Sequence, residues 1–113
     1  MNNLKTMLSE LVNGILAVMY GRVIKIILYG STARGTRTPE SDIDVAVIFN
    51  DLENKHSNDR LSSISDLIVD LNLKYDAVLS VIDIDEERFK KLKNILPFYK
   101  NIDNEGIILW KKI

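Results

Sequence analysis

The sequence contains no cysteine and only one histidine among its 113 residues. Disulfide bonds, cysteine-ligated zinc and thiol catalysis are therefore excluded within this chain, and so is a metal site built from several histidines. The absence of cysteine fits a reducing compartment, and a cytoplasmic location is expected. The single histidine, His56, stands among polar residues and is interpreted as a loop residue and not as a metal ligand.

Long apolar runs and a strong charge of one sign are missing as well. No run approaches the roughly 20 apolar residues that cross a bilayer, and the polar N-terminal segment does not resemble a signal peptide. Lysine and arginine together number 15 against 16 acidic residues, which gives a formal net charge of −1. This balance provides no bulk attraction to nucleic acid or to an anionic membrane, so neither is expected as a partner.

Length and hydrophobic periodicity predict one α/β domain over residues 1–113, with an ordinary globular composition of 46% hydrophobic residues. Apolar residues at helical spacing predict helices over about 3–20 and 59–72. Acids in a first turn followed by lysines predict a short helix over 85–92, and 97–104 is expected to form another short helix or a turn. Short apolar runs, the first of them rich in β-branched residues, predict strands over 23–29, 42–49 and 76–82. The apolar segment 107–110 is expected to be a last strand or a docked tail. Strands that alternate with helices favour a mixed sheet with helices packed mainly on one face. The first two strands are joined too closely for a helical crossover, so they are expected to be antiparallel neighbours.

Two aspartates of the second predicted strand, Asp42 and Asp44, share one face because side chains alternate along a strand. On a mostly apolar strand, two such carboxylates repel each other and lose hydration. A divalent cation would remove both costs, and carboxylate oxygens favour Mg²⁺ or Mn²⁺. The alternative is that both acids are solvated or cap the loop at the exposed strand entrance, and their spacing alone does not exclude it.

A glycine and a serine, Gly30 and Ser31, follow the first predicted strand. A glycine at this point lets the backbone approach a ligand closely, and a helical turn over 32–35 would present free N–H groups to a phosphate. The alternative is an ordinary strand exit in which Ser31 caps the turn. Neither the P-loop pattern nor the dinucleotide-binding glycine pattern is present.

The glycine–serine turn and the aspartate pair are joined by only ten residues, 32–41. If the two strands are neighbours, phosphate oxygens held by the turn and a metal held by the aspartates meet at one place. Those are the parts needed for phosphoryl or nucleotidyl transfer, in which positioning and charge neutralisation supply most of the catalysis.

This arrangement, Gly30-Ser31 followed after ten residues by Asp42-Ile43-Asp44, resembles the signature of the DNA polymerase β-like nucleotidyltransferase superfamily. The string over 30–35 and the C-terminal segments 97–102 and 105–110 resemble its minimal nucleotidyltransferase branch. The resemblance covers most of the chain and is least specific over about 50–72. It implies a catalytic palm, formed by a mixed sheet with helices on one side, that binds ATP or another nucleoside triphosphate with Mg²⁺ or Mn²⁺.

The resemblance also implies roles for individual residues. Gly30 and Ser31 would hold the triphosphate, and Asp42 and Asp44 would bind the metal. All four would then count as nucleotide-binding or catalytic residues of the chain.

Members of the branch carry a third acid on a later strand, and Asp76, expected to open the third strand, is the candidate for that metal ligand and proton acceptor. The alternative for Asp76 is a solvated strand start or a turn residue. Arg34 resembles an arginine that reaches phosphate, although it could instead pair with Glu40 or Asp42. Asp85 is expected to cap the helix that follows the third strand.

Many members of the branch are antitoxins encoded beside a HEPN-domain toxin, and some transfer AMP from ATP to a tyrosine of that toxin. The resemblance therefore implies a metal-dependent protein adenylyltransferase acting on a HEPN partner. A non-catalytic module that neutralises the toxin by contact is the alternative. Transfer to a small molecule, as in aminoglycoside-modifying relatives, is disfavoured because the chain is too short for the further substrate-binding domain of those enzymes. Homo- and hetero-oligomers are compatible with these readings.

Overall fold

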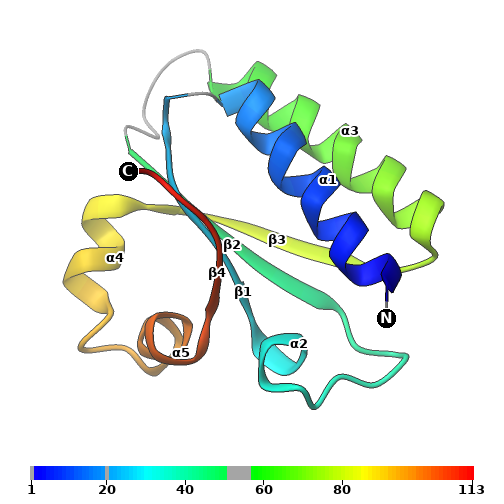
Figure 1. Ribbon diagram of the computed structural model, residues 1–113. Helices are drawn as coiled ribbons and strands as arrows, with labels where there is room; N and C mark the ends of the chain where they lie inside the picture. The colour runs from blue at the N-terminus through cyan, green and yellow to red at the C-terminus, as the bar shows by residue number, and fades with distance from the viewer. Residues whose placement is uncertain (1, 20, 51–56) are drawn as a thin grey trace.

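The protein folds around a mixed sheet of four strands, which helices cover on both faces (Figure 1). The computed structural model describes residues 2–19, 21–50 and 57–113. Its elements follow the order α1 (Asn2–Met19), β1 (Val23–Tyr29), α2 (Gly30–Arg34), β2 (Ile43–Phe49), α3 (Ser57–Tyr75), β3 (Leu79–Asp85), α4 (Glu86–Leu92), α5 (Pro97–Glu105) and β4 (Ile107–Lys111). The predicted α/β class with a mixed sheet is confirmed, but the helices lie on both faces of the sheet and not mainly on one, because its two faces carry separate apolar cores. Predictions for 51–56, including His56, lie outside the described residues.

The strands lie side by side in the order β3-β2-β1-β4. Strand β1 pairs antiparallel with β2 and with β4, whereas β2 pairs parallel with β3. The prediction that the first two strands are antiparallel neighbours is confirmed. The ten residues between Ser31 and Asp42 contain no crossover helix, which a parallel arrangement of these strands would need. Their register places Tyr29 opposite Asp44, so the end of β1 lies beside the start of β2.

The two faces of β2 belong to two different apolar cores. Ile43, Val45 and Val47 pack into the larger core, which α1 and α3 close from one side. The buried stripe of α1 consists of Met7, Leu8, Leu11, Ile15 and Met19, as the helical spacing predicts. The alternate residues Ala46 and Ile48 pack into a smaller core on the other face, as strand geometry requires.

The two long helices share one face of the sheet, and the shorter α4 and α5 lie against the other (Figure 1). Phe89 of α4 and Ile102 of α5 are the buried anchors of the short helices. Asp44 precedes Ala46 by two residues, so it lies on the face of this smaller core. In the part of the chain that the structure describes, no helix is both long and apolar enough to cross a membrane.

The third strand begins three residues later than the sequence predicts. Helix α3 continues to Tyr75 instead of ending near residue 72, and Asp76 follows it with a positive φ of 49°. Asn72 then holds the connection, since its Oδ1 accepts a hydrogen bond from the Leu79 N–H at 2.9 Å. The prediction that Asp76 opens the third strand is therefore wrong, because that residue lies in the turn that ends α3.

Candidate active site

No residue separates β1 from α2, since the strand ends at Tyr29 and the helix begins at Gly30. This is two residues earlier than predicted, and it places Ser31 inside the first turn instead of at the cap. The capping residue is Tyr29, whose backbone is extended and whose side chain makes no capping hydrogen bond. Gly30 itself has a φ of 73°, a conformation that favours glycine.

Gly30 lies directly against the carboxylate of Asp44. A methyl group built on Gly30 would collide with Oδ2 of that aspartate. The contact follows from the β1–β2 register, which puts Asp44 opposite the last residue of β1. Because Gly30 has no side chain, there is room for the Asp44 carboxylate beside the first turn of α2. This is where phosphates and a metal would have to meet.

Asp42 and Asp44 lie on the same face, at the start of β2. Asp42 is exposed and stands just before the strand, which begins at Ile43, whereas Asp44 is partly buried. The loop that leads to them is held by Ser41, whose Oγ accepts a hydrogen bond from the Thr38 N–H at 3.0 Å.

The electrostatics of this pair fit a divalent cation. Partial burial raises the pKa of Asp44 above its ordinary value, the negative charge of Asp42 raises it further, and the Arg34 guanidinium opposes both. An oxygen-rich pair whose charges repel each other is the donor set that Mg²⁺ or Mn²⁺ would neutralise. These residues therefore fit the metal that the sequence predicts.

Arg34 and Tyr29 form the edges of the site. The Nη1 of Arg34 lies 3.6 Å from Oε2 of Glu105 on α5, with both side chains about half exposed. The ion pair that the sequence suggested as an alternative for Arg34 thus forms, but with Glu105 and not with Glu40 or Asp42. Burial, together with the nearby Asp44 charge, raises the pKa of Tyr29 to about 12.

Asp76 does not join the two aspartates. It is exposed in the turn after α3, and no group of three histidine, aspartate or glutamate residues among those described is close enough to hold a metal ion. Asp85 has the predicted role of a helix cap, because its side chain accepts a hydrogen bond from the Arg88 N–H at 3.2 Å.

Sequence reasoning missed the contribution of α5 to the site. Phe98 meets the ring of Tyr29 edge to face with 5.8 Å between the ring centres, and it stays half exposed. Glu105 of the same helix binds Arg34. No local signal announces either contact, because both depend on how α5 packs against β1 and α2 in the folded chain.

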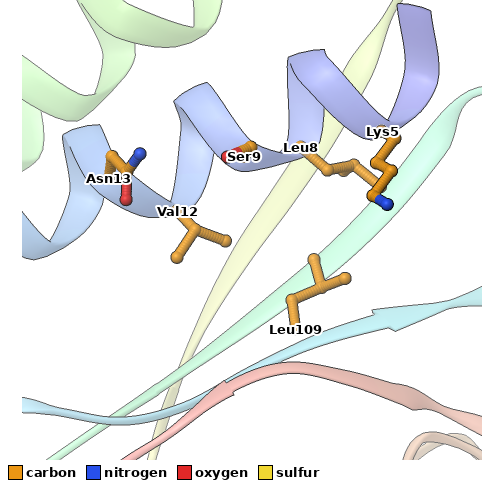
Figure 2. Close-up of a pocket in the computed structure, with 6 residues that line it drawn as sticks. All are labelled: Lys5, Leu8, Ser9, Val12, Asn13 and Leu109. Carbon is orange, nitrogen blue, oxygen red and sulfur yellow. The ribbon is translucent and has the colours of Figure 1, made fainter. Parts of the chain in front are cut away.

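A hollow between α1 and β4 lies on the opposite face of the sheet (Figure 2). Leu8 and Val12 of α1 face Leu109 of β4 across it, and Lys5 stands at its edge. Leu8 is buried in the larger core and Val12 and Leu109 pack against that core, whereas Asp44 lies on the face of the smaller core. The hollow is therefore separate from the aspartate site.

Comparison with known proteins shows which family the chain belongs to. A model of the nucleotidyltransferase domain family matches residues 8–109. A protein of Methanocaldococcus jannaschii that is provisionally named a protein adenylyltransferase is 38% identical over 103 residues, which are 91% of this chain and 94% of that protein. A second protein of that organism with the same provisional name is 39% identical over 75 residues, which cover 66% of this chain and half of that protein.

Solved structures share the fold at 20% sequence identity. A provisionally named nucleotidyltransferase of Sulfolobus solfataricus superimposes with a TM-score of 0.61, over 95% of this chain and 79% of that one. A toxin–antitoxin complex with AMP-PNP contains a chain that matches with a TM-score of 0.58, over 90% of this chain and 72% of that one. A variant of the toxin–antitoxin complex MntA–HpeT matches with a TM-score of 0.57, over 89% of this chain and 71% of that one. With a family model that matches residues 8–109 and a relative 38% identical over 91% of the chain, the chain belongs to the nucleotidyltransferase domain family and is a nucleotidyltransferase.

Proposed function

We propose that the chain is a metal-dependent protein adenylyltransferase, which transfers AMP from ATP to a hydroxyl group of a partner protein. The partner that fits best is a cognate HEPN-domain toxin modified on a tyrosine, so that the chain acts as its antitoxin. The relative that aligns over nearly its whole length carries the name of a protein adenylyltransferase. Two similar solved structures are toxin–antitoxin complexes, one of them with AMP-PNP.

The observation that carries the proposal is the contact of Gly30 with Asp44, beside the charge of Asp42. It brings the turn that would hold phosphate and the acids that would hold metal to one point. In the MntA–HpeT variant, two aspartates two residues apart are changed to glutamate, and Asp42 and Asp44 have the same spacing.

In the proposed reaction, the hydroxyl oxygen of the partner forms a bond to the α-phosphorus of ATP. The bond between that phosphorus and the α–β bridging oxygen breaks, pyrophosphate leaves, and the hydroxyl proton passes to solvent or to a base of the complex. Asp42 and Asp44 would hold Mg²⁺ or Mn²⁺, while Gly30, Ser31 and Arg34 would position the triphosphate. The metal would neutralise phosphate charge and favour the ionised form of the attacking oxygen.

Intact-mass measurement of the HEPN protein, after incubation with the chain, ATP and Mg²⁺, tests the proposal. We expect mass gains of whole AMP units, lost when Asp42 and Asp44 are both changed to Asn. A matched control changes Asp66 and Asp70, two exposed acids of α3, to Asn and alters the net charge equally. Transfer that survives the Asp42/Asp44 change would reject the metal assignment.

A binding module that neutralises the toxin by contact is the second candidate. It is favoured by the absence of a third carboxylate beside Asp42 and Asp44 among the described residues. A stable complex with the toxin and no mass gain with any of the four common nucleoside triphosphates would support this candidate over the enzyme.

A further inference from the structure

The register between β2 and β3 determines which residues of β3 share the face of the two aspartates. The strands run parallel, with Ile43 opposite Leu79 and Asp44 opposite Ser80. The ladder extends one residue before β3, because the Ile43 N–H donates to the Val78 carbonyl oxygen at 2.8 Å. Val78 therefore stands opposite Asp42, at the spacing of neighbouring strands, about 4.8 Å.

The side chain of Val78 lies on the aspartate face. Ile43 and Leu79 are both buried in the larger core on the other side of the sheet, and side chains of consecutive residues point to opposite faces. Val78 is accordingly 54% exposed, at the end of the sheet where Asp42 is also exposed.

Asp76 lies in the turn that ends α3 and not on the strand that carries Val78. Its φ of 49° is a left-handed conformation, which Asp and Asn tolerate better than most residues and which often ends a helix. Next to it, the Ala77 N–H returns to the carbonyl oxygen of Asn72 at 3.2 Å. This turn interrupts the extended backbone, so the alternation that places Val78 and Ser80 on the aspartate face does not continue to Asp76.

We infer that, within the described residues, Asp42 and Asp44 are the whole carboxylate set for the metal, and that Val78 occupies the place from which a third carboxylate would complete it. Asp76 instead ends α3. The inference rests on the proposed function, since it concerns the same metal. Mg²⁺ is commonly held by one or two carboxylates together with substrate phosphates, so the nucleotide is expected to strengthen metal binding to this chain.

The test is titration of the metal-free chain with Mn²⁺, with free Mn²⁺ followed by electron paramagnetic resonance, in the absence and presence of ATP. Wild-type protein should bind Mn²⁺ weakly alone and much more tightly with ATP. Val78→Asp should tighten binding without ATP by about tenfold or more, because affinity rises with the number of charged ligands. Val78→Asn is the matched control without charge and should not tighten it.

Asp76→Asn tests the other half of the inference. Asn also tolerates the left-handed conformation, so this variant should fold normally and bind Mn²⁺ within about twofold of wild type, since it removes no metal ligand. A loss as large as that of Asp42→Asn would overturn the inference and leave the proposed function standing.

The remaining outcomes are also decisive. Mn²⁺ binding that neither Asp42→Asn nor Asp44→Asn weakens would reject the metal site itself, and with it the proposed function. A folded Val78→Asp protein whose Mn²⁺ affinity does not rise would overturn the role given to position 78. Should Val78→Asp melt at a much lower temperature, Val78→Glu at the same half-exposed position replaces it, with the same expected gain.

Discussion

Gly30 and the Asp44 carboxylate lie so close together that any side chain at position 30 would have to displace the carboxylate. The contact joins the end of β1 to the start of β2, because Tyr29 and Asp44 are opposite each other in the antiparallel ladder. Position 30 requires glycine for two reasons: the space beside Asp44 leaves no room for a Cβ, and the φ of 73° favours glycine. The two reasons can be separated by experiment.

Gly30→Ala is expected to destabilise the fold and to weaken the binding of ATP with Mn²⁺. The left-handed backbone alone costs an alanine about 1–2 kcal/mol, and the new methyl group must also displace the Asp44 carboxylate. Gly35→Ala is the matched control, because Gly35 has a similar φ of 77° and a methyl group there meets nothing within 4 Å. Urea unfolding should show a loss for both variants, whereas calorimetric titration with ATP should show impaired binding only for Gly30→Ala. Equal impairment would mean that Gly30 does not act through Asp44.

Asp44→Asn is expected to raise the melting temperature of the metal-free protein at neutral pH. Partial burial and then the charge of Asp42 raise the pKa of Asp44 above 3.8, so the folded protein holds this proton more tightly than the unfolded chain. The ionised carboxylate therefore costs stability above the raised pKa, and that cost disappears as the pH falls through it. The advantage of the variant should shrink on acidification.

Thermal melting between about pH 4 and pH 8 measures this effect. With Mn²⁺ and ATP the order should reverse, because a ligand that binds only the folded state raises its stability and the variant has lost a metal ligand. A metal-free variant that melts below wild type at neutral pH would show that Asp44 stabilises the fold and is not held there at a cost.

Local patterns were sufficient to predict most of the elements and the aspartate pair. The apolar stripe of α1 and the alternation along β2 are set by neighbouring residues, and the glycine–serine turn and the aspartates are separated by a short segment. Asp85 was predicted as a cap for the same reason, because a helix cap depends on residues within one turn.

The segment around Asp76 was misassigned because helix and strand signals overlap there. Leu71, Leu73 and Tyr75 suit either structure, and the choice depends on where α3 ends. That end is set by the turn at Asp76 and by the bond from the Leu79 N–H to Asn72. Register across β2 and β3, which brings Val78 beside Asp42, is likewise a property of the assembled sheet.

Arg34 and Glu105 offer a test of electrostatic competition in the site. Glu105→Gln should change stability by less than about 1 kcal/mol, because exposed ion pairs contribute little. It should tighten ATP binding, since Arg34 is released from its partner at 3.6 Å. Arg34→Ala should weaken ATP binding, most clearly at low salt.

A matched control for this test is Glu10→Gln, which breaks the exposed pair between Lys74 and Glu10 at 2.8 Å. That pair joins α1 to α3, on the other face of the sheet, and its loss should leave ATP binding unchanged. Calorimetric titration of the three variants with ATP and Mn²⁺ measures the effects. If Glu105→Gln weakens ATP binding, then Glu105 supports the nucleotide site and does not compete for Arg34.

Tyr29 is a polar side chain beside Asp44, and its pKa determines what it can do there. Burial first, and the charge of Asp44 second, raise that pKa to about 12. Tyr29 is therefore protonated at neutral pH and cannot accept the proton of an attacking hydroxyl. Tyr29→Phe should accordingly keep most of the AMP transfer, with any loss independent of pH.

The pKa of Tyr29 is measurable by NMR titration of tyrosine labelled at the ring carbon that bears the hydroxyl, with Tyr29→Phe as the assignment. Asp44→Asn should lower that pKa, because it removes the charge that disfavours the phenolate, and leave it above the ordinary value of 10.0 because burial persists. A Tyr29→Phe variant that abolishes transfer while still binding ATP would contradict this view. Tyr29 is protonated and no third carboxylate lies beside Asp42 and Asp44 among the described residues, so the described part of the chain offers no further carboxylate at the metal as proton acceptor, and solvent, the bound nucleotide or a group of the partner protein is expected to take the proton.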